Sequence, residues 1–291
     1  MFKKLCLIGV GLIGGSIAKA ARKHAIVDTV VAYGEEEHVA NLQLAVDLGV
    51  IDNYTSDIAQ ALDGADLVII ATPVGAIHHI AELLMPHWNA ECIYSDVGST
   101  KSNVVDAIHA VFGYVPVNFI PAHPIAGAER SGVSAAREDL FSGRRLIITP
   151  LINSDPLAVS QLSRFWQSLG SSVSTMSVDH HDMVLAATSH LPHVLAFALV
   201  AMLGRKDEQK EIFKYAAGGF KDFSRIASSD PTMWQDICLA NKQHILPLIQ
   251  QLKSEITSIE DLITHNQATE LFETFTYARN ARQRYLDQLE D

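Results

Sequence analysis

The sequence predicts an α/β fold built on a doubly wound, mainly parallel sheet and followed by an all-α domain. Three observations carry this prediction. A Gly-x-Gly-x-x-Gly motif lies between a strand pattern and a helix pattern, apolar strand runs alternate with helical segments over residues 1–176, and such runs are sparse over residues 177–291. We therefore predict two domains, residues 1–176 and residues 177–291.

Composition limits the classes of protein and of partner. The chain has 291 residues, of which 48% are hydrophobic, so it can bury substantial cores. A net charge of −11, with no basic cluster, argues against nucleic acid as a partner. No uninterrupted apolar run approaches membrane-spanning length and no signal-peptide pattern opens the chain, so we expect a cytoplasmic protein with no membrane partner. The three cysteines, which lie far apart, suggest neither a disulfide framework nor a zinc motif.

The first motif predicts a dinucleotide site. The strand-like run Lys4 to Val10 leads into Gly9-Val-Gly11-Leu-Ile-Gly14 and then into a helical pattern. In this context Gly9 permits the tight turn, Gly11 lets a pyrophosphate approach the backbone, and Gly14 lets helix and strand pack closely. The helix N-terminus offers free N–H groups to phosphates. These features give a Rossmann-type domain with cofactor contacts at Gly9, Gly11, Leu12, Ile13 and Gly14, the alternative being a glycine turn without a ligand.

The second strand, Thr29 to Tyr33, bears on the choice of cofactor. NAD-binding sites place an acidic residue at the end of this strand, where the chain has Gly34. Three glutamates follow, and Glu35 could still reach the ribose hydroxyls. Carboxylates without an adjacent arginine repel a 2′-phosphate, which favours NAD over NADP. The alternative is that these glutamates are a solvated charge run that opens the next helix.

The alternation of helices and strands continues toward a second cofactor segment. Helices are predicted at Val39 to Leu48 and Asp57 to Leu62, and the apolar run Asp66 to Ala71 is typical of a parallel strand that is covered on both faces. Thr72, Pro73 and Val74 end that strand and should lie along the cofactor. A helix at Ile77 to Met85, a strand at Cys92 to Ser95, and Ser99 follow. Ser99 would lie beside the nicotinamide or, alternatively, serve as a helix N-cap.

The segment Pro121 to Gly132 holds the candidate general base. It places His123 between two prolines after an apolar run, Val115 to Ile120. An imidazole titrates near neutral pH, so a histidine held at a strand end can accept a proton, although most single histidines are surface or core residues. Strands at Arg145 to Thr149 and Ser172 to Met176, with a helix at Asp155 to Leu169 between them, should complete the sheet.

The second half is predicted to be helical and contains two polar clusters. Helices are expected at Met183 to Leu203, interrupted or kinked by Pro192, and at Glu208 to Tyr215, Pro231 to Ser254 and Ala268 to Leu289. His190 and His193 share a helical face, but without a further ligand cluster no metal site is predicted. After a glycine pair come Lys221, Asp222 and Arg225; Arg225 could hold a substrate carboxylate, or pair with Asp222 at a helix end.

Five blocks, taken in order, resemble one enzyme family. They are GVGLIGGS, DVGSTKS, HPIAGAERSG, SHLPH and GGFKDFSRIASSDPTMWQDI, and together they are similar to the prephenate and arogenate dehydrogenases of tyrosine biosynthesis. The resemblance covers essentially the whole chain. It implies an oxidoreductase that oxidatively decarboxylates prephenate to 4-hydroxyphenylpyruvate, or arogenate to tyrosine, with hydride transfer to NAD. It also implies a homodimer joined through the helical domain.

The same resemblance implies roles for individual residues. His123 matches the family histidine that hydrogen-bonds the ring hydroxyl of the substrate and accepts its proton, and Ser99 matches a second partner of that hydroxyl. Arg225 matches the clamp on a substrate carboxylate. If His123 is the base, activity should rise with pH through the imidazole range. The resemblance also implies roles for His193 and Glu129 in the pocket and its gating, and for Asp222 and Trp234 in the pocket or its dimer edge.

Two other functions fit parts of the sequence. A 3-hydroxyacid dehydrogenase also joins a Rossmann domain to a helical domain, but it generally uses a lysine in the helical half, for which Lys221 is the candidate. A regulator that senses NAD without chemistry would need the glycine motif alone. The HPIAG and GGFKDF blocks argue against the regulator.

Overall fold

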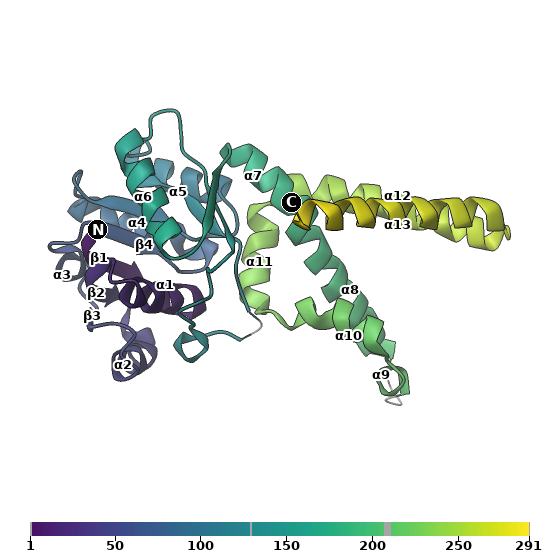
Figure 1. Ribbon diagram of the computed structural model, residues 1–291, viewed down its shortest axis with the longest axis horizontal. Coiled ribbons are helices and arrows are strands. Elements are labelled where there is room, and N and C mark those ends of the chain that lie inside the picture. Colours follow the sequence, from purple (N-terminus) through teal and green to yellow (C-terminus); the bar gives the residue numbers. More distant parts are fainter. Residues whose placement is uncertain (1, 129, 207–210, 291) are drawn as a thin grey trace. The chain divides into compact units, whose positions relative to one another are not determined.

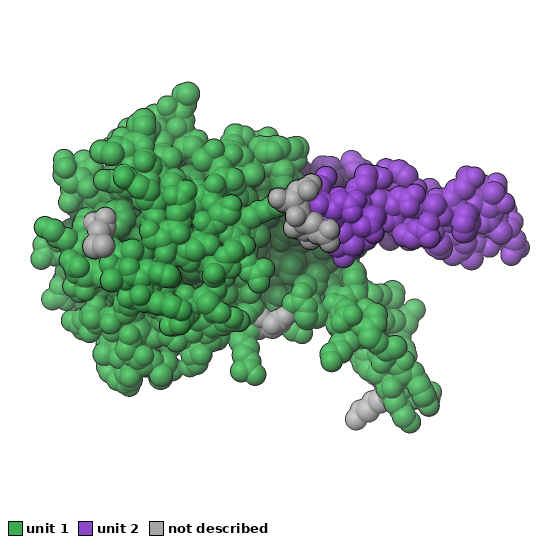
Figure 2. Space-filling model, viewed as in Figure 1, with its two compact units in different colours: residues 1–242 green, residues 243–291 purple. Residues whose placement is uncertain are grey.

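The computed structural model describes residues 2–128, 130–206 and 211–290. They form two compact units, Met1–Lys242 and Gln243–Asp291 (Figure 2). The larger unit contains two sheets and the helices through α11, and the smaller is a helical hairpin (Figure 1).

A six-stranded parallel sheet forms the base of the larger unit. Its strand order is β3-β2-β1-β4-β5-β6, with the change of direction beside β1 that produces a ligand crevice in doubly wound sheets. The strands are β1 (Phe2–Ile8), β2 (Val27–Tyr33), β3 (Asn53–Thr55), β4 (Leu67–Ile70), β5 (Ile93–Asp96) and β6 (Phe119–Ile120).

Helices cover both faces of this sheet, as the continuous apolar runs predict. Along β1, Leu5 and Leu7 point into one core, shared with α1, α2 and α6, and Cys6 and Ile8 point into the other, shared with α3, α4 and α5. Strand β1 is therefore apolar at consecutive positions because both of its faces are buried. The helices are α1 (Leu12–Lys23), α2 (Val39–Asp47), α3 (Ile58–Leu62), α4 (Ile77–Leu84), α5 (Ser102–Phe112) and α6 (Pro156–Ser168). Short helical turns are η1 (Glu36–His38), η2 (Val74–Ala76), η3 (Met85–His87) and η4 (Val133–Ala135).

Two details of the predicted sheet are wrong. The strands at residues 145 and 172 do not extend the main sheet: β7 (Ala122–Pro124), β8 (Arg145–Ile148) and β9 (Ser172–Thr175) form a separate sheet in which β7 pairs antiparallel with β8. The run Val115 to Ile120 is a strand only at Phe119–Ile120, and Pro116, which cannot donate to a ladder, lies in the part that is not strand. His123 lies on β7, paired with Ile147.

The helical segments from residue 178 onward carry the remaining candidate residues. They are α7 (Val178–Leu185), the π-helical turn η5 (Ala186–His190), α8 (Leu191–Lys206), α9 (Glu211–Lys214), α10 (Gly218–Ser224), η6 (Arg225–Ser228), α11 (Pro231–Ala240), α12 (Lys242–Thr264) and α13 (Ala268–Glu290). The interruption predicted at Pro192 is the π-turn on its N-terminal side. The helix predicted over Pro231 to Ser254 is instead two helices that meet at Asn241. The start of the helix predicted at Glu208 lies outside the described residues.

One helical stretch bears on the expectation about membranes. The residues Val178–Lys206 form a stretch of 29 residues that is long and apolar enough, by length and composition alone, to cross a membrane; the mean hydropathy of its 18-residue window is 1.7, and 22% of that window is buried. Polar residues, among them Ser189, His190 and His193, interrupt this stretch, so it is not an uninterrupted apolar run of the kind that the sequence lacks. Such a helix is weak support for a membrane location, and these histidines make polar contacts within the protein.

Candidate active site

The glycine turn after β1 has the geometry that a dinucleotide site needs. Gly9 has a φ of +95°, and a Cβ there would lie 2.9 Å from the Ala71 carbonyl oxygen, while a Cβ on Gly14 would lie 2.2 Å from the Gly9 oxygen. Both positions therefore require glycine. A Cβ on Gly11 would meet no atom of the described chain within 4 Å. Gly11 therefore lies at open backbone, where a phosphate can approach the N-terminus of α1.

The end of β4 lies against this turn, as predicted. A Cβ on Gly9 would be 3.2 Å from Thr72 Cγ2, so Thr72 and the glycine motif are neighbours. The hydroxyl of Thr72 is buried and has no hydrogen-bond partner within the described protein. Pro73 and Val74 continue into η2. An unpaired buried hydroxyl beside open glycine backbone fits a bound NAD, which Gly9, Gly11, Leu12, Ile13, Gly14, Thr72, Pro73 and Val74 would hold.

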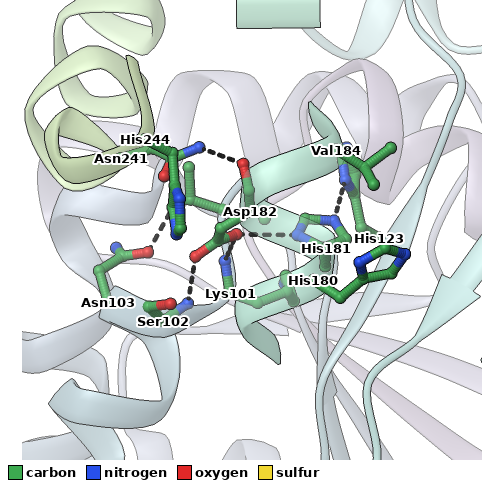
Figure 3. A network of polar contacts seen from close by, with 12 residues as sticks. Lys101, Ser102, Asn103, His123, His180, His181, Asp182, Val184, Asn241 and His244 are labelled. Carbon is green, nitrogen blue, oxygen red and sulfur yellow. Dashed lines mark hydrogen bonds and ion pairs between the residues drawn. The ribbon is translucent and has the colours of Figure 1, made fainter. Parts of the chain in front are cut away.

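A chain of hydrogen bonds lies behind His123 (Figure 3). His123 Nδ1 is 2.9 Å from His181 Nε2, and His181 Nδ1 is 2.8 Å from Asp182 Oδ1. The Asp182 carboxylate also accepts the backbone N–H groups of Lys101 and Ser102, each at 2.8 Å. Asp182 thus binds the free N–H groups at the start of α5, where the helix dipole favours a negative charge.

The charge state of Asp182 fixes the protons along this chain. Burial acts to raise the pKa of Asp182, but hydrogen bonds from His181, Ser102 and Lys101 outweigh it and lower the pKa to about 2. An ionised carboxylate only accepts, so His181 Nδ1 carries the proton and His181 Nε2 is an acceptor. His123 Nδ1 must then donate. The Nε2 atom of neutral His123 is left as a bare acceptor, which is the state a general base requires.

Burial keeps His123 in this neutral form. The side chain is 8% exposed, and burial, followed by the charges of His181, Lys101 and His190, lowers the pKa of His123 well below its ordinary value of 6.5. Burial also lowers the pKa of His181, opposed by the hydrogen bond to Asp182. The acidic limb of any His123-dependent activity therefore lies below the ordinary imidazole range, which corrects the pH range expected from the sequence.

A buried ion pair holds the strand that carries His123. Lys101 and Asp96 are both fully buried and in contact, and Lys101 Nζ also donates to the Ala122 carbonyl at 2.8 Å. Burial lowers the pKa of Lys101, an effect that Asp96 opposes. Asp96 Oδ2 also accepts the Gly98 N–H at 2.8 Å, and a Cβ on Gly98 would lie 2.9 Å from that oxygen. The DVGSTK block thus locks the end of β5 to β7, immediately before His123.

Three of the pocket residues implied by the family resemblance lie together. The rings of His193 and Trp234 stack with centroids 3.7 Å apart and an angle of 18° between them. Burial lowers the pKa of His193, and the positive charge of Arg225 adds to this effect, which places Arg225 nearby. His193 Nδ1 donates to the Ser189 carbonyl at 2.9 Å, which leaves Nε2 as an acceptor.

The remaining predicted residues are less closely connected. Ser99 is half-buried in the turn after β5, its backbone lies beside His190, and no hydrogen bond joins its hydroxyl to His123 in the described part of the chain. Asp222 is exposed on α10. Glu129 lies outside the described residues. Lys221, the candidate lysine of a hydroxyacid dehydrogenase, is also exposed on α10.

Sequence reasoning missed the residues behind His123. His181, Asp182, Lys101, Asp96 and Asn241 are not singled out by the sequence. Asn241 Nδ2 lies 2.8 Å from the Asp182 carbonyl and 3.0 Å from His190 Nδ1, so it ties α11 to α7 and η5. The only signal in the sequence is an ionisable pair, Asp96 and Lys101, that closes an apolar strand; the pairing of His181 with His123 leaves no local trace.

Comparison with known proteins agrees with this geometry. A family model described as "Prephenate dehydrogenase, nucleotide-binding domain" matches residues 17–175, and one described as "Prephenate dehydrogenase, dimerization domain" matches residues 177–277. The chain is 35% identical to a cyclohexadienyl dehydrogenase of Zymomonas mobilis over 97% of this chain and 96% of that protein. It is 38% identical to a prephenate dehydrogenase of Bacillus subtilis, over 96% of this chain and 75% of that protein.

Solved structures show the same relationship. The prephenate dehydrogenase of A. aeolicus in complex with hydroxyphenyl propionate and NAD+ has a TM-score of 0.89 and 34% identity, with 98% of both chains covered. The arogenate dehydrogenase of Synechocystis has a TM-score of 0.79 and 27% identity, covering 97% of this chain and 99% of the other. By sequence and fold, the chain belongs to the prephenate dehydrogenase family.

Proposed function

We propose that this NAD-linked oxidoreductase carries out the oxidative decarboxylation of prephenate, of arogenate or of both, in tyrosine biosynthesis. The single observation that supports this most strongly is the hydrogen-bond chain from Asp182 through His181, which leaves Nε2 of neutral His123 free to take a proton from a substrate hydroxyl. The reaction needs one such acceptor because oxidation of the hydroxyl-bearing carbon makes its O–H acidic.

The proposed reaction uses His123 twice, first to take a proton and then to return it. NAD, when bound, supplies the hydride acceptor for the hydrogen on the carbon that bears the ring hydroxyl. As that C–H bond breaks, His123 Nε2 takes the hydroxyl proton and a ring carbonyl forms. The bond to the ring carboxylate then breaks and carbon dioxide leaves. The electron pair of that bond completes the aromatic ring, and the proton returns from His123 to the oxygen.

Other residues bind the anionic substrate in this proposal. Arg225 clamps a carboxylate by paired hydrogen bonds. His193 and Trp234 line the pocket near the substrate side chain, supported by their stacking and by the nearby charge of Arg225. Ser99 offers a second hydrogen bond to the ring hydroxyl, and Asp222 and Glu129 contribute to the pocket.

We also propose the organisation of the whole enzyme. Residues 1–176 bind the cofactor, and residues 177–291 complete the substrate pocket and join two copies into a homodimer in the cytoplasm. The match to a family dimerization domain over residues 177–277 supports the second role. The large apolar side chains exposed on α12 and α13 support it as well.

The experiment that tests the function is a two-by-two assay of prephenate and arogenate with NAD and NADP, followed by NADH or NADPH absorbance and by product chromatography. We expect turnover with NAD and at least one of the two substrates. Saturable NAD binding with no turnover of either substrate would overturn the proposal.

A further inference from the structure

The ribose end of the cofactor site differs from the usual arrangement because of one packing contact. A Cβ on Gly34, the position where an acid is expected, would lie 2.7 Å from Leu42 Cδ1, and Leu42 is 2% exposed in the core. An acidic side chain at residue 34 would therefore displace a core residue. The next acidic residue along the chain is Glu35, which directly precedes η1.

Glu35 has a partner on a different element. His79, in the first turn of α4, places Nε2 2.8 Å from Glu35 Oε1. The two side chains are 56% and 45% exposed, so both can also contact a ligand. Helix α4 follows directly on Thr72, Pro73, Val74 and η2. The cofactor segment at the end of β4 and the partner of Glu35 thus belong to one connection of the chain.

We propose that His79 is a specificity-determining residue that makes the choice between NAD and NADP depend on pH. With neutral His79, the Glu35 carboxylate keeps its charge, accepts hydrogen bonds from the ribose hydroxyls of NAD and repels the 2′-phosphate of NADP. With protonated His79, the pair is neutral overall and a cation faces the 2′-phosphate. The selectivity for NAD therefore falls as the pH falls. This inference depends on the cofactor site, but not on the identity of the oxidised substrate.

The other charged groups around His79 reinforce this behaviour. On α4, Glu82 Oε2 lies 3.9 Å from His79 Nδ1, and His78 pairs with Glu82 at 3.6 Å. On the side of β2 and η1 are Tyr33, Glu36, Glu37 and His38, of which His38 lies 3.9 Å from Glu37. Burial raises the pKa of Tyr33, with a further contribution from Glu35, so Tyr33 adds no negative charge near neutral pH. In this set of groups, only imidazoles can supply a positive charge, and His79 is the one whose ring hydrogen-bonds the Glu35 carboxylate.

The test is the dissociation constant of each dinucleotide, measured by calorimetry without substrate at about pH 6 and about pH 8. The variant is His79→Asn, and the matched control is His78→Asn, which removes the adjacent imidazole of the same helix. The quantity compared is the dissociation constant of NADP divided by that of NAD. At the lower pH, this ratio should be roughly fivefold smaller in the unmodified enzyme and in His78→Asn than in His79→Asn. Protonation of the 2′-phosphate of free NADP is the same for all three proteins and cancels when they are compared at one pH.

The outcomes separate this inference from the proposed function. The same pH change in His79→Asn as in the unmodified enzyme would overturn the role of His79. Failure of both dinucleotides to bind would instead overturn the cofactor site. A second variant, Glu35→Gln, should reduce the preference for NAD at both pH values, because it removes the carboxylate on which His79 acts.

Discussion

At His123, burial and hydrogen bonding determine different properties of one imidazole. Burial keeps the ring neutral, and the hydrogen bond to His181 decides which nitrogen is bare. The substitution His123→Asn keeps a polar side chain but removes the proton acceptor. We expect the turnover number to fall roughly 100-fold to 10,000-fold, the range typical of a lost general base. Steady-state NADH formation measures this loss, and circular dichroism checks that the variant is folded. Unchanged turnover would exclude His123 as the base.

The pH dependence of the unmodified enzyme tests the same residue without a mutation. A general base must be unprotonated, and the pKa of His123 is lowered well below 6.5 by burial and by nearby charges. Protonation, and with it the loss of activity, should therefore occur only on the acid side of the ordinary imidazole range. We expect kcat to be level near neutral pH and to fall at lower pH, as measured in buffers of constant ionic strength. A profile that still rises between about pH 6.5 and pH 8 would contradict a buried, neutral His123.

Arg225 should act on binding more than on chemistry. In the proposed pocket, Arg225 pairs with a substrate carboxylate in the ground state and the transition state alike, and Arg225→Ala removes that pair. Such a loss raises KM more than it lowers kcat. Arg225→Lys keeps the charge but not the planar pair of donors, so it should recover only part of the affinity. Initial-rate kinetics of both variants separate the two constants. A fall in kcat without a change in KM would remove Arg225 from the binding role.

At the scale of elements, the first half of the fold follows from local pattern and the second sheet does not. Strand β1, its glycine turn and α1 could be predicted because the apolar run, the close contacts of Gly9 and Gly14 and the helix are contiguous. Strand β8 has an equally clear pattern, but its partners β7 and β9 are chosen by tertiary packing, which the pattern of a single strand does not encode.

The candidate site divides in the same way. The sequence singles out His123, Arg225 and the glycines because each belongs to a block with a chemical reason of its own. His181 pairs with a residue 58 positions away, and Asp182 with the start of a helix 80 and 81 positions away. A hydrogen bond between elements has no period in the sequence, so these positioning residues emerge only when α7 is packed against α5.

Asp182, on α7, binds the start of α5, and its replacement tests how much this contact contributes. The new side chain in Asp182→Asn has one oxygen instead of two, so one of the buried backbone N–H groups of Lys101 and Ser102 loses its acceptor. We expect the free energy of unfolding to fall on the order of 2 kcal/mol. Turnover should fall as well, because His181 is no longer held in one tautomer. Urea denaturation followed by circular dichroism gives the stability.

A matched control for Asp182 exists in α6. The Asp155 carboxylate, at the N-cap of α6, accepts the Leu157 N–H at 2.9 Å in a solvent-exposed hydrogen bond. Asn and Asp are nearly equivalent N-caps, so Asp155→Asn should change stability little. Equal effects of the two substitutions would show that Asp182 is an ordinary cap without a special role.

For the molecule as a whole, the buried histidines predict how stability depends on pH. Burial lowers the pKa of His190 to about 4, whereas an unfolded histidine titrates near 6.5. Below that value the unfolded chain takes up a proton that the folded protein does not, so the free energy of unfolding falls as the pH falls. His190 alone should cost about 2 kcal/mol by about pH 5, and His123, His181 and His193 act in the same direction.

The measurement is urea denaturation at several pH values. The variant His190→Gln should show a shallower decline in stability between about pH 7 and pH 5, because one buried imidazole is gone. His87→Gln, which alters an exposed histidine, should follow the unmodified protein. If His190→Gln and the unmodified protein declined with the same slope, His190 would not be held neutral by the fold.

The helical hairpin of α12 and α13 exposes an aromatic face that is suited to assembly. Phe272 and Phe275 lie three residues apart on α13 and are 71% and 54% exposed. Residues at this spacing share a helical face, and exposing two aromatic rings on one face to water is unfavourable in free energy. A second copy of the chain that covers this face recovers that free energy, so light scattering should give about twice the 31.8 kDa of one chain.

The double substitution Phe272→Asp and Phe275→Asp should yield monomers. Glu273→Arg, which changes charge on a neighbouring face, should leave the dimer intact. A monomeric unmodified protein, or a dimer that both aspartates leave unchanged, would place the dimer contact elsewhere or remove it.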